Sequence, residues 1–477
     1  MTVSRCILYN EQNKSLHHAG GSKEELMRLN IYHTNDIHTN FAFLGRVCAY
    51  LEEHRTESDL YLDSGDFLDL KSLVVQADRG GSALALAKFC RMDAMALGNN
   101  EIDLGSEDLK KLTSFPLLCA NICRNDGSPV PGLKSHLILE RCGKRFLIIG
   151  LAPFYGLGML ADKYNVFFEM GNLHTLDPVP AVTQILCENR GKYDFSILLS
   201  HSGHAVDREL SKRLPPVDLW LEGHSHSVVT EKCCSQSGMG EFLGRVTLDV
   251  QEQGIEILNS VQIELPAQES AEFMYRLGQA QESAEAVLSQ ELPVLRELDF
   301  EPFRESEFTN FICDCLKAEF GCDLALMHSG IAEGSLRRPV SRRSLLELLP
   351  SKLNPTIYSL PGEKLLEAAK ASLDEAHIRQ PGKGAGFRGT VLGCLGYSSN
   401  VEVHRAPFTM LVDGQPVEPG RVYTVVTDDY LQRGTGYPSL AAPDQDAKFD
   451  KRFIRDLVQE YLTVEPVFRS AAKHRET

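Results

Sequence analysis

Five segments of the sequence place acidic, amide or imidazole side chains directly after a short apolar run. Carboxylate, amide and imidazole ligands in one site suit Mn, Zn, Fe or Co better than Ca. In the D-x-H and H-x-H patterns, residues two apart on an extended backbone point to the same side, so one metal ion can take both. The sequence therefore predicts a metal site built from Asp36-Ile37-His38, Asp63-Ser64-Gly65-Asp66, Gly98-Asn99-Asn100-Glu101, Ser200-His201-Ser202-Gly203-His204 and Gly223-His224-Ser225-His226.

Strands must position these motifs, because each motif follows an apolar run of strand length. The runs cover residues 29–33, 60–64, 94–98, 146–152, 195–200 and 219–223, and longer helix-like segments separate them. This alternation predicts an α/β fold with a two-layered or sandwiched sheet. Sites in α/β folds gather outside the carboxyl ends of strands, so motifs that are far apart in sequence can converge there. Residues 243–265 then alternate around Gly254, which predicts a hairpin that closes the first domain.

The chain of 477 residues is long enough for two or three domains, at about 100–200 residues each. Residues 1–28 are polar and aperiodic, and we expect them to lie outside the fold. Residues 267–300 are rich in Ala, Gln, Glu and Leu at helical spacing, which predicts a linking helix. We therefore expect a metal-bearing domain at 29–266, a smaller α+β substrate domain at 301–466 and a tail at 467–477.

Charge and cysteine content limit the partners and the location. The chain has 65 acidic and 49 basic residues and a net charge of −16, which disfavours nucleic acids and anionic membrane surfaces as partners. The 13 cysteines are odd in number and scattered, which is atypical of a secreted disulfide framework. The first residues contain no apolar stretch typical of a signal peptide. We expect a cytoplasmic protein, and its oligomeric state stays open.

The order of the metal motifs, D-x-H, G-D, G-N-x-E, S-H-x-G and G-H-S-H, resembles that of the calcineurin-like metallophosphoesterases. More narrowly, the chain is similar to the 5′-nucleotidase/2′,3′-cyclic phosphodiesterase family, because the likeness continues into the second domain. Family motifs occur there at Asn310, Asp314 and residues 321–325, 427–430 and 436–438. The resemblance covers about residues 29–465 and implies a two-domain hydrolase.

The resemblance also implies two divalent metal ions, Mn, Zn or Fe. Carried over to this sequence, the ligands of one ion are Asp36, His38, Asp66 and His226. The ligands of the other are Asp66, Asn99, His201 and His224, with Asp66 bridging the two ions. A hydroxide held between the ions would attack phosphorus, and the ions would take up the developing charge.

One position departs from the family pattern G-N-H-(E/D), because the chain reads GNNEID. Asn100 replaces a His that stabilises the transition state or protonates the leaving oxygen, and Asp103 keeps the position of its partner. Asn donates a hydrogen bond but delivers no proton at neutral pH. Three alternatives follow: a substrate with a good leaving group such as a phosphoanhydride, a substitute acid, for which His204 is nearest in sequence, or weak catalysis.

The second domain also departs from the pattern. The family's G-G-I-R corresponds to Ser329-Gly330-Ile331-Ala332, so a phosphate-binding Arg is missing, and G-G-D-G-Y corresponds to residues 433–437. Tyr430 matches a position that stacks on a base in the family, although core packing explains an aromatic residue there equally well. Arg337, in the run RRPVSRR, and Phe387 and Arg388, in a Gly-rich loop at 381–389, are further candidate substrate contacts. A solvated face and a plain connector are the alternatives for these two segments.

Taken together, the residues and the resemblance predict a metal-dependent hydrolase of a small phosphate ester or anhydride. A nucleotide or nucleotide derivative is the first substrate class to expect. The alternative is a catalytically attenuated metal- or nucleotide-binding protein that keeps the fold and has lost the chemistry at Asn100.

Overall fold

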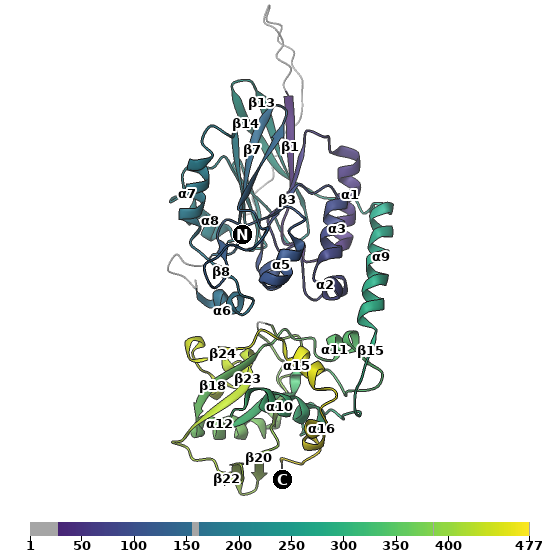
Figure 1. Ribbon diagram of the computed structural model, residues 1–477, viewed down its shortest axis with the longest axis vertical. Coiled ribbons are helices and arrows are strands. Elements are labelled where there is room, and N and C mark those ends of the chain that lie inside the picture. The colour runs from purple at the N-terminus through teal and green to yellow at the C-terminus, as the bar shows by residue number, and fades with distance from the viewer. Residues whose placement is uncertain (1–26, 155–161, 385, 477) are drawn as a thin grey trace, which may run out of the picture.

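The computed structural model describes residues 27–154, 162–384 and 386–476, which form two lobes joined at one side by a long helix (Figure 1). The N-terminal lobe contains two six-stranded sheets packed face to face. The predicted two-domain α/β architecture with a sandwiched first domain is confirmed. The expected extension at 1–28 falls almost wholly outside the described residues, because the description begins at Met27.

The two sheets of the first domain contain all six strands predicted from the apolar runs. The first sheet has the order β14 (Gly254–Ile263), β13 (Leu243–Gln251), β1 (Met27–Thr34), β2 (Leu60–Asp63), β3 (Ala94–Ala96) and β4 (Leu117–Leu118). The second has the order β11 (Val228–Glu231), β12 (Cys234–Ser237), β10 (Leu219–Glu222), β9 (Phe195–Ser200), β7 (Lys144–Leu151) and β6 (His136–Arg141). The short strands β5 (Ile122–Cys123) and β8 (His174–Thr175) pair separately.

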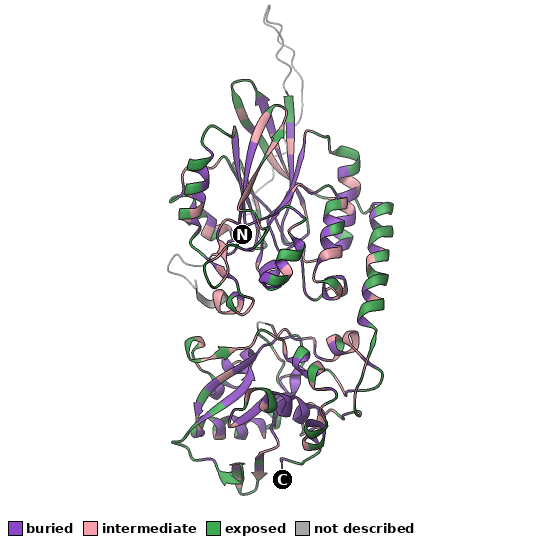
Figure 2. Cartoon of the chain, viewed as in Figure 1, coloured by how far each residue is buried: buried purple, intermediate pink, exposed green. Residues whose placement is uncertain are grey.

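Helices cover the outer faces of both sheets and complete a four-layer domain. Buried apolar side chains fill the space between the sheets, so the central strands are buried on both faces (Figure 2). Helices α1 and α3 pack on one sheet, and α7 and α8 pack on the other. The helices of this domain are α1 (Phe41–His54), α2 (Leu73–Asp78), α3 (Gly81–Phe89), α4 (Asn99–Ile102), α5 (Ser106–Leu112), α6 (Asp162–Met170), α7 (Pro178–Glu188) and α8 (His204–Leu210).

The strands that precede the metal motifs run parallel within each sheet, so their carboxyl ends share an edge. In the first sheet β1 pairs with β2 and β2 pairs with β3, all parallel. In the second sheet β9 lies parallel to both β7 and β10. The predicted closing hairpin is confirmed as the antiparallel pair β13 and β14, with Gln251 opposite Gly254 at the turn.

The linking helix α9 (Ala271–Leu288) is shorter than the predicted span of 267–300 and packs against α2 and α3. Two buried residues on one face, Phe273 and Leu277, belong to the core of the first domain. After α9 the chain becomes extended, because β15 (Glu291–Leu292) pairs with β17 (Val340–Ser341) of the second domain.

The second domain is built on a five-stranded mixed sheet with its own core. Its order is β19 (Leu395–Tyr397), β16 (Leu324–His328), β23 (Val422–Asp428), β18 (Pro355–Pro361) and β24 (Lys448–Phe449). A three-stranded sheet contains β20 (Val401–Arg405), β21 (Phe408–Val412) and β22 (Gln415–Pro416). The helices are α10 (Glu307–Phe320), α11 (Arg342–Leu348), α12 (Gly362–Ser372), α13 (Glu375–Ile378), α14 (Asp429–Gln432), α15 (Ile454–Tyr461) and α16 (Glu465–Ala471).

The end of the chain packs into this domain, although residues 467–477 are expected as a tail. Helix α16 contacts α10, and Phe468 lies against Phe311 with ring centroids 4.4 Å apart. The buried guanidinium of Arg475 donates a hydrogen bond of 2.6 Å to Asp314. These contacts make the last described residues part of the core.

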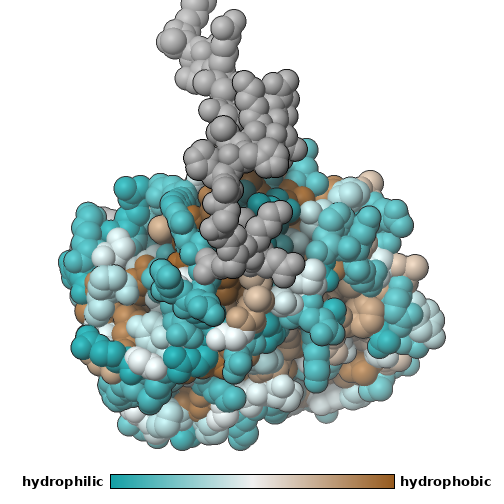
Figure 3. Space-filling view, turned by 90° about the horizontal axis from the view of Figure 1, so that it is seen from above, coloured by the Kyte–Doolittle hydropathy of each residue, from teal (hydrophilic) through white to brown (hydrophobic). Residues whose placement is uncertain are grey.

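No helix among the described residues is long and apolar enough to cross a bilayer. The face in Figure 3 is mostly hydrophilic, with apolar side chains scattered among polar ones. Scattered apolar residues are ordinary on a protein surface.

A fully buried histidine in β1 makes the stability of the fold depend on pH. His33 contacts the hydroxyls of Ser235 at 2.9 Å and Ser237 at 3.3 Å, and burial lowers its pKa from 6.5 to about 3. Below about pH 6.5, His33 is therefore protonated in the unfolded chain but stays neutral in the folded chain. The free energy of unfolding falls as the pH falls through this range. His33→Gln keeps hydrogen-bonding capacity and removes this titration.

Between about pH 7.5 and about pH 5.5 we expect the wild type to lose about 1.4 kcal/mol more free energy of unfolding than His33→Gln. Denaturant titration at the two pH values measures the difference. An equal loss in both proteins would show that His33 takes up its proton in the folded state.

Candidate metal centre

The segments that follow β1, β2, β3, β9 and β10 carry all seven predicted metal ligands, six in loops and Asn99 as the first residue of α4. Five of the seven have a positive φ without being glycine: Asp36 (48°), His38 (47°), Asp66 (54°), His224 (71°) and His226 (52°). Such left-handed conformations are uncommon outside glycine and gather at functional sites. These five residues therefore adopt strained backbone conformations, and their side chains point toward one another.

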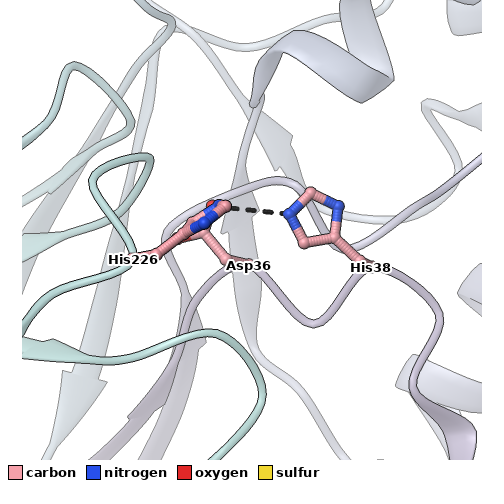
Figure 4. Close-up of side chains that lie close together, drawn as sticks. All are labelled: Asp36, His38 and His226. Carbon is pink, nitrogen blue, oxygen red and sulfur yellow. Dashed lines mark ion pairs between the residues drawn. The ribbon is translucent and has the colours of Figure 1, made fainter. Parts of the chain in front are cut away.

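One cluster consists of Asp36, His38 and His226, whose side chains converge from two loops in Figure 4. Oδ1 of Asp36 lies 3.3 Å from Nε2 of His226 and 3.8 Å from Nε2 of His38. The rings of His38 and His226 meet edge to face, with centroids 5.5 Å apart. One ion would fit among these three side chains.

A second cluster contains Asp36, Asp66 and His201, all buried. Nε2 of His201 lies 3.4 Å from Asp66 and 3.7 Å from Asp36. Nδ1 of His201 lies 2.8 Å from the carbonyl oxygen of Ser64, which fixes the proton on Nδ1 and leaves the Nε2 lone pair for an ion. Asp66 also lies 3.8 Å from His38 of the first cluster, so it stands between the two groups.

The two remaining predicted ligands lie together beside this second cluster. Nδ1 of His224 is 3.1 Å from Oδ1 of Asn99, and the His224 ring meets the His201 ring with centroids 5.2 Å apart. The His224 backbone N–H donates to Asp36 at 2.9 Å. The structure thus brings all seven predicted ligands to one edge of the sandwich.

Unsatisfied buried atoms show that this donor set fits metal ions. Oδ1 of Asp36, Nε2 of His38 and Nε2 of His201 are buried and have no hydrogen-bond partner among the described residues. Oδ1 of Asp36 lies 3.8 Å from Nε2 of His38 and 3.7 Å from Nε2 of His201, distances that exceed good hydrogen bonds but suit two ligands of a shared ion at about 2.0–2.2 Å each. Buried polar atoms are otherwise almost always paired, so the site is shaped for divalent ions.

The buried carboxylates of Asp36 and Asp66 also favour a positive charge in the site. Burial opposes a charged imidazole, yet Asp66 and Asp36 raise the pKa of His201 to about 10. Burial likewise opposes the charge of Asp66, but His201 and His38 hold its pKa well below the ordinary value. The two carboxylates therefore require a cation, which a bound metal ion supplies in place of the proton on His201.

Glu101 supports the site without belonging to either cluster, a role that the motif alone did not reveal. Its buried carboxylate accepts backbone N–H groups of Asp66 (2.9 Å), Leu68 (2.8 Å) and Gly98 (2.8 Å). These bonds tie the loop after β2 to the loop after β3. Burial, assisted by the charge of Asp66, raises the pKa of Glu101 to about 7.

Gly98 makes room for the carboxylate between the clusters. A Cβ at this position would lie 2.1 Å from Oδ1 of Asp66 and 2.3 Å from its backbone nitrogen. We therefore expect Gly98→Ala to displace Asp66 and to weaken metal binding and metal-dependent activity at least about tenfold, the effect expected when the supports of a metal ligand are lost.

Gly278→Ala provides the control for this substitution, because nothing lies within 4 Å of a Cβ there and the residue is inside α9. It should leave metal affinity unchanged and stabilise the helix slightly. Calorimetric metal titration of both variants, with circular dichroism as a check of folding, measures the effect. Wild-type metal affinity in a folded Gly98→Ala protein would contradict the assigned position of Asp66.

The three predicted catalytic residues lie in different surroundings. Asn100 is buried, with Nδ2 at 2.9 Å from Asp66 and 3.1 Å from Nδ1 of His38, so it contacts both clusters. Asp103 follows α4 and is exposed. His204 turns to Glu222 at 2.7 Å and contacts Cys234. The described contacts thus place Asn100 at the metal centre and give His204 other partners.

The predicted aromatic contacts of the second domain pack on each other. Phe387 and Tyr430 are buried and stacked, with ring centroids 5.0 Å apart and planes 26° apart, and both contact His328. A base between two rings needs about 7 Å, which is two van der Waals contacts of about 3.5 Å. Stacking on a base would require the rings to part by about 2 Å.

The two predicted arginines have different surroundings. Arg337 forms ion pairs with Glu297 at 3.2 Å and Asp299 at 2.6 Å, so its guanidinium is already neutralised. Arg388 is exposed and lines a pocket between the domains. Ala385, within the same predicted loop, lies outside the described residues.

Sequence reasoning missed two cations that line the same pocket as Arg388. Lys352 reaches across to the first domain and lies 3.5 Å from Asp69, three residues after Asp66. Arg455 is only 6% exposed and donates to two backbone carbonyls, and among the described residues it forms no ion pair with a carboxylate. Neither residue belongs to a motif, because only the packing of the two domains brings them to the pocket.

This fold and this donor set define a metal-dependent phosphoesterase. Residues 29–228 match the calcineurin-like phosphoesterase family, and residues 286–442 match the family of 5′-nucleotidase C-terminal domains. The chain belongs to the calcineurin-like phosphoesterases, of the type that carries a 5′-nucleotidase C-terminal domain, and it is a hydrolase.

The chain resembles the uncharacterized metallophosphoesterase YunD of Bacillus subtilis, with 28% identity over 90% of this chain and 98% of that protein. It is 23% identical to the trifunctional nucleotide phosphoesterase protein YfkN of the same organism over 74% of this chain, but it spans only 28% of that longer protein. The solved structure of Haemophilus influenzae NAD nucleotidase shares the fold, with a TM-score of 0.60 and 16% identity, covering 93% of this chain and 97% of that one.

Proposed function

We propose that the protein hydrolyses a phosphate ester or anhydride, most readily a nucleotide or nucleotide derivative, with two divalent metal ions. The observation that carries this proposal is the set of buried, unpartnered ligand atoms on Asp36, His38 and His201. Asp66 lies within 3.8 Å of a histidine of each cluster, which suits a bridging ligand. The ions, when bound, would activate a water molecule and stabilise negative charge on phosphoryl oxygens.

The chain's own residues would orient these ligands and exclude solvent. Ser64 fixes the tautomer of His201, and Glu101 fixes the backbone around Asp66. Asn100 would donate a hydrogen bond to a phosphoryl oxygen or to the carboxylate of Asp66. Because an amide delivers no proton, Asn100 cannot protonate the leaving group, which favours phosphoanhydrides and other good leaving groups over alkyl esters.

The second domain supports an anionic, nucleotide-like substrate. Lys352, Arg388 and Arg455 line an interdomain pocket together with Lys71, in a protein whose net charge is −16. Guanidinium and ammonium groups bind phosphate oxygens well. Phe387 and Tyr430 would bind a base after their stack opens. The name of the relative YfkN, a nucleotide phosphoesterase, agrees with this substrate class.

A cytoplasmic location belongs to the same proposal. The twelve cysteines in the described part of the chain are free thiols, and seven of them are buried. Free thiols persist in reducing compartments.

The test is phosphate release from nucleoside monophosphates, nucleoside diphosphates, nucleotide sugars and cyclic nucleotides in the presence of Mn²⁺. We expect hydrolysis that stops when a chelator is added and that is fastest on anhydrides. Absence of turnover on every substrate, with two ions shown to be bound, would instead support the alternative of an attenuated binding protein.

A further inference from the structure

A third group of metal-type ligands lies outside the metal centre and takes part in none of the chemistry above. It consists of His204 at the start of α8, Glu222 at the end of β10 and Cys234 at the start of β12. One ligand atom from each lies within 4.8 Å of the others. Nδ1 of His204 is 2.7 Å from Oε2 of Glu222 and 4.0 Å from Sγ of Cys234.

These three side chains differ in exposure in a way that suits an ion site. Glu222 is 2% exposed, whereas His204 and Cys234 are half-buried, so an ion could enter from solvent and reach a buried carboxylate. A carboxylate buried to this degree normally needs a positive partner. His204 supplies one close contact to Glu222, at 2.7 Å, and a bound cation would supply positive charge directly.

A second, independent observation comes from Asp207, one turn further along α8. Its side chain is 1% exposed, Oδ1 accepts a hydrogen bond of 2.6 Å from Ser200, and Oδ2 is buried with no hydrogen-bond partner in the described part of the chain. Burial and the neighbouring charge of Glu222 raise the pKa of Asp207 well above its ordinary value, and burial, Glu222 and, to a lesser degree, Asp207 raise the pKa of the Cys234 thiol. The carboxylates of Glu222 and Asp207 and the thiol of Cys234 are therefore electrostatically coupled, and His204 is the imidazole that contacts Glu222.

We propose that His204, Glu222 and Cys234 form a third, structural metal site selective for Zn²⁺, with Asp207 or a water molecule as the fourth ligand. Imidazole, carboxylate and thiolate together suit Zn²⁺, which prefers four ligands and accepts soft sulfur. The Cys234 thiol would lose its proton to solvent as the ion binds, and Zn²⁺ would balance the two charges on sulfur and Glu222.

The site would stabilise the loops that carry the metal centre. His204 follows the predicted ligand His201 by three residues, and Glu222 precedes the predicted ligand His224 by two. An ion joining α8, β10 and β12 would hold both loops in register. This inference does not depend on the proposed activity, because the site contains none of the seven predicted ligands.

Co²⁺ is the probe, because a thiolate ligand gives Co²⁺ an intense near-ultraviolet charge-transfer absorption that nitrogen and oxygen ligands lack. None of the seven predicted ligands of the metal centre is a cysteine, so the band reports on a cysteine outside that centre, and variants of Cys233 and Cys234 identify which one. We expect it in the chelator-treated full-length protein, also when Asp66→Asn disables the metal centre. Zn²⁺ added in stoichiometric amount should abolish the band.

Cys233→Ser is the matched control, because Cys233 is the exposed neighbour of Cys234 and contributes no ligand. It should keep the band, whereas Cys234→Ser should lose it together with one equivalent of bound Zn²⁺ per chain. His204→Ala, which leaves both sulfurs in place, should weaken Co²⁺ binding at least tenfold. The band absent from the wild type, or equally strong in a folded Cys234→Ser protein, would overturn the site and leave His204 and Glu222 as a simple hydrogen-bonded pair.

Discussion

Asp66→Asn should lower metal-dependent phosphate release by at least about 10³-fold, because the two proposed ions would supply several kcal/mol of transition-state stabilisation and each 1.4 kcal/mol is a tenfold change in rate. Asp66 lies 3.8 Å from His38 and 3.4 Å from His201, one histidine from each cluster. An amide at this position has nearly the same shape but lacks the negative charge that would hold both ions. The measurement is kcat/KM with Mn²⁺ on the best substrate of the panel.

Asp78→Asn is the control for this prediction, because it makes the same chemical change at an exposed carboxylate that accepts hydrogen bonds from Gly80 and Ser82 at the start of α3. It should keep wild-type kcat/KM. Calorimetry should show that Asp66→Asn binds fewer equivalents of Mn²⁺ per chain than the wild type, or binds Mn²⁺ with much lower affinity. Near-normal activity in Asp66→Asn would contradict the bridging position.

The second large effect concerns Asn100 and the leaving group. The wild type should hydrolyse phosphates with good leaving groups, such as anhydrides and aryl esters, far faster than alkyl esters, because no proton donor occupies position 100. Asn100→His should raise the rate on alkyl esters by about 10²–10⁴-fold, the usual contribution of a general acid, and should change the rate on anhydrides little. The measurement is the rate of hydrolysis of a series of phosphate esters that differ in leaving-group pKa. The slope of log kcat/KM against leaving-group pKa is then compared between the wild type and Asn100→His.

Asn100→Ala separates two roles of this residue: support of the ligands Asp66 and His38, and its effect on the leaving group. Without the amide contacts at 2.9 Å to Asp66 and 3.1 Å to His38, metal affinity should fall by about 10–100-fold, while the leaving-group slope keeps its wild-type value. A loss of rate in Asn100→His on every substrate would show that Asn100 serves mainly to hold the metal ligands.

The metal centre could be predicted from the sequence because its ligands follow strands directly. A residue just after β1 or β10 has its position set by the strand and a few loop residues, so Asp36 and His226 converge once the sheets form. The hairpin of β13 and β14 was predictable for the same reason, since its pattern and its turn are local.

The substrate contacts depend on tertiary packing and were much less predictable. Arg337 sits in a conspicuous basic run, yet Glu297 and Asp299 neutralise it. His204 is close to His201 in sequence, but its ring faces Glu222. Arg455 and Lys352 stand in no motif and reach the interdomain pocket only because the two domains pack together.

Anomalous diffraction from crystals of the protein loaded with Mn²⁺ would locate the bound ions directly. We predict two peaks about 3.5–4 Å apart with Asp66 between them. One peak should contact Asp36, His38 and His226, and the other His201 and His224. A single peak, or ions bound elsewhere while these residues keep the positions described here, would contradict a two-metal hydrolase.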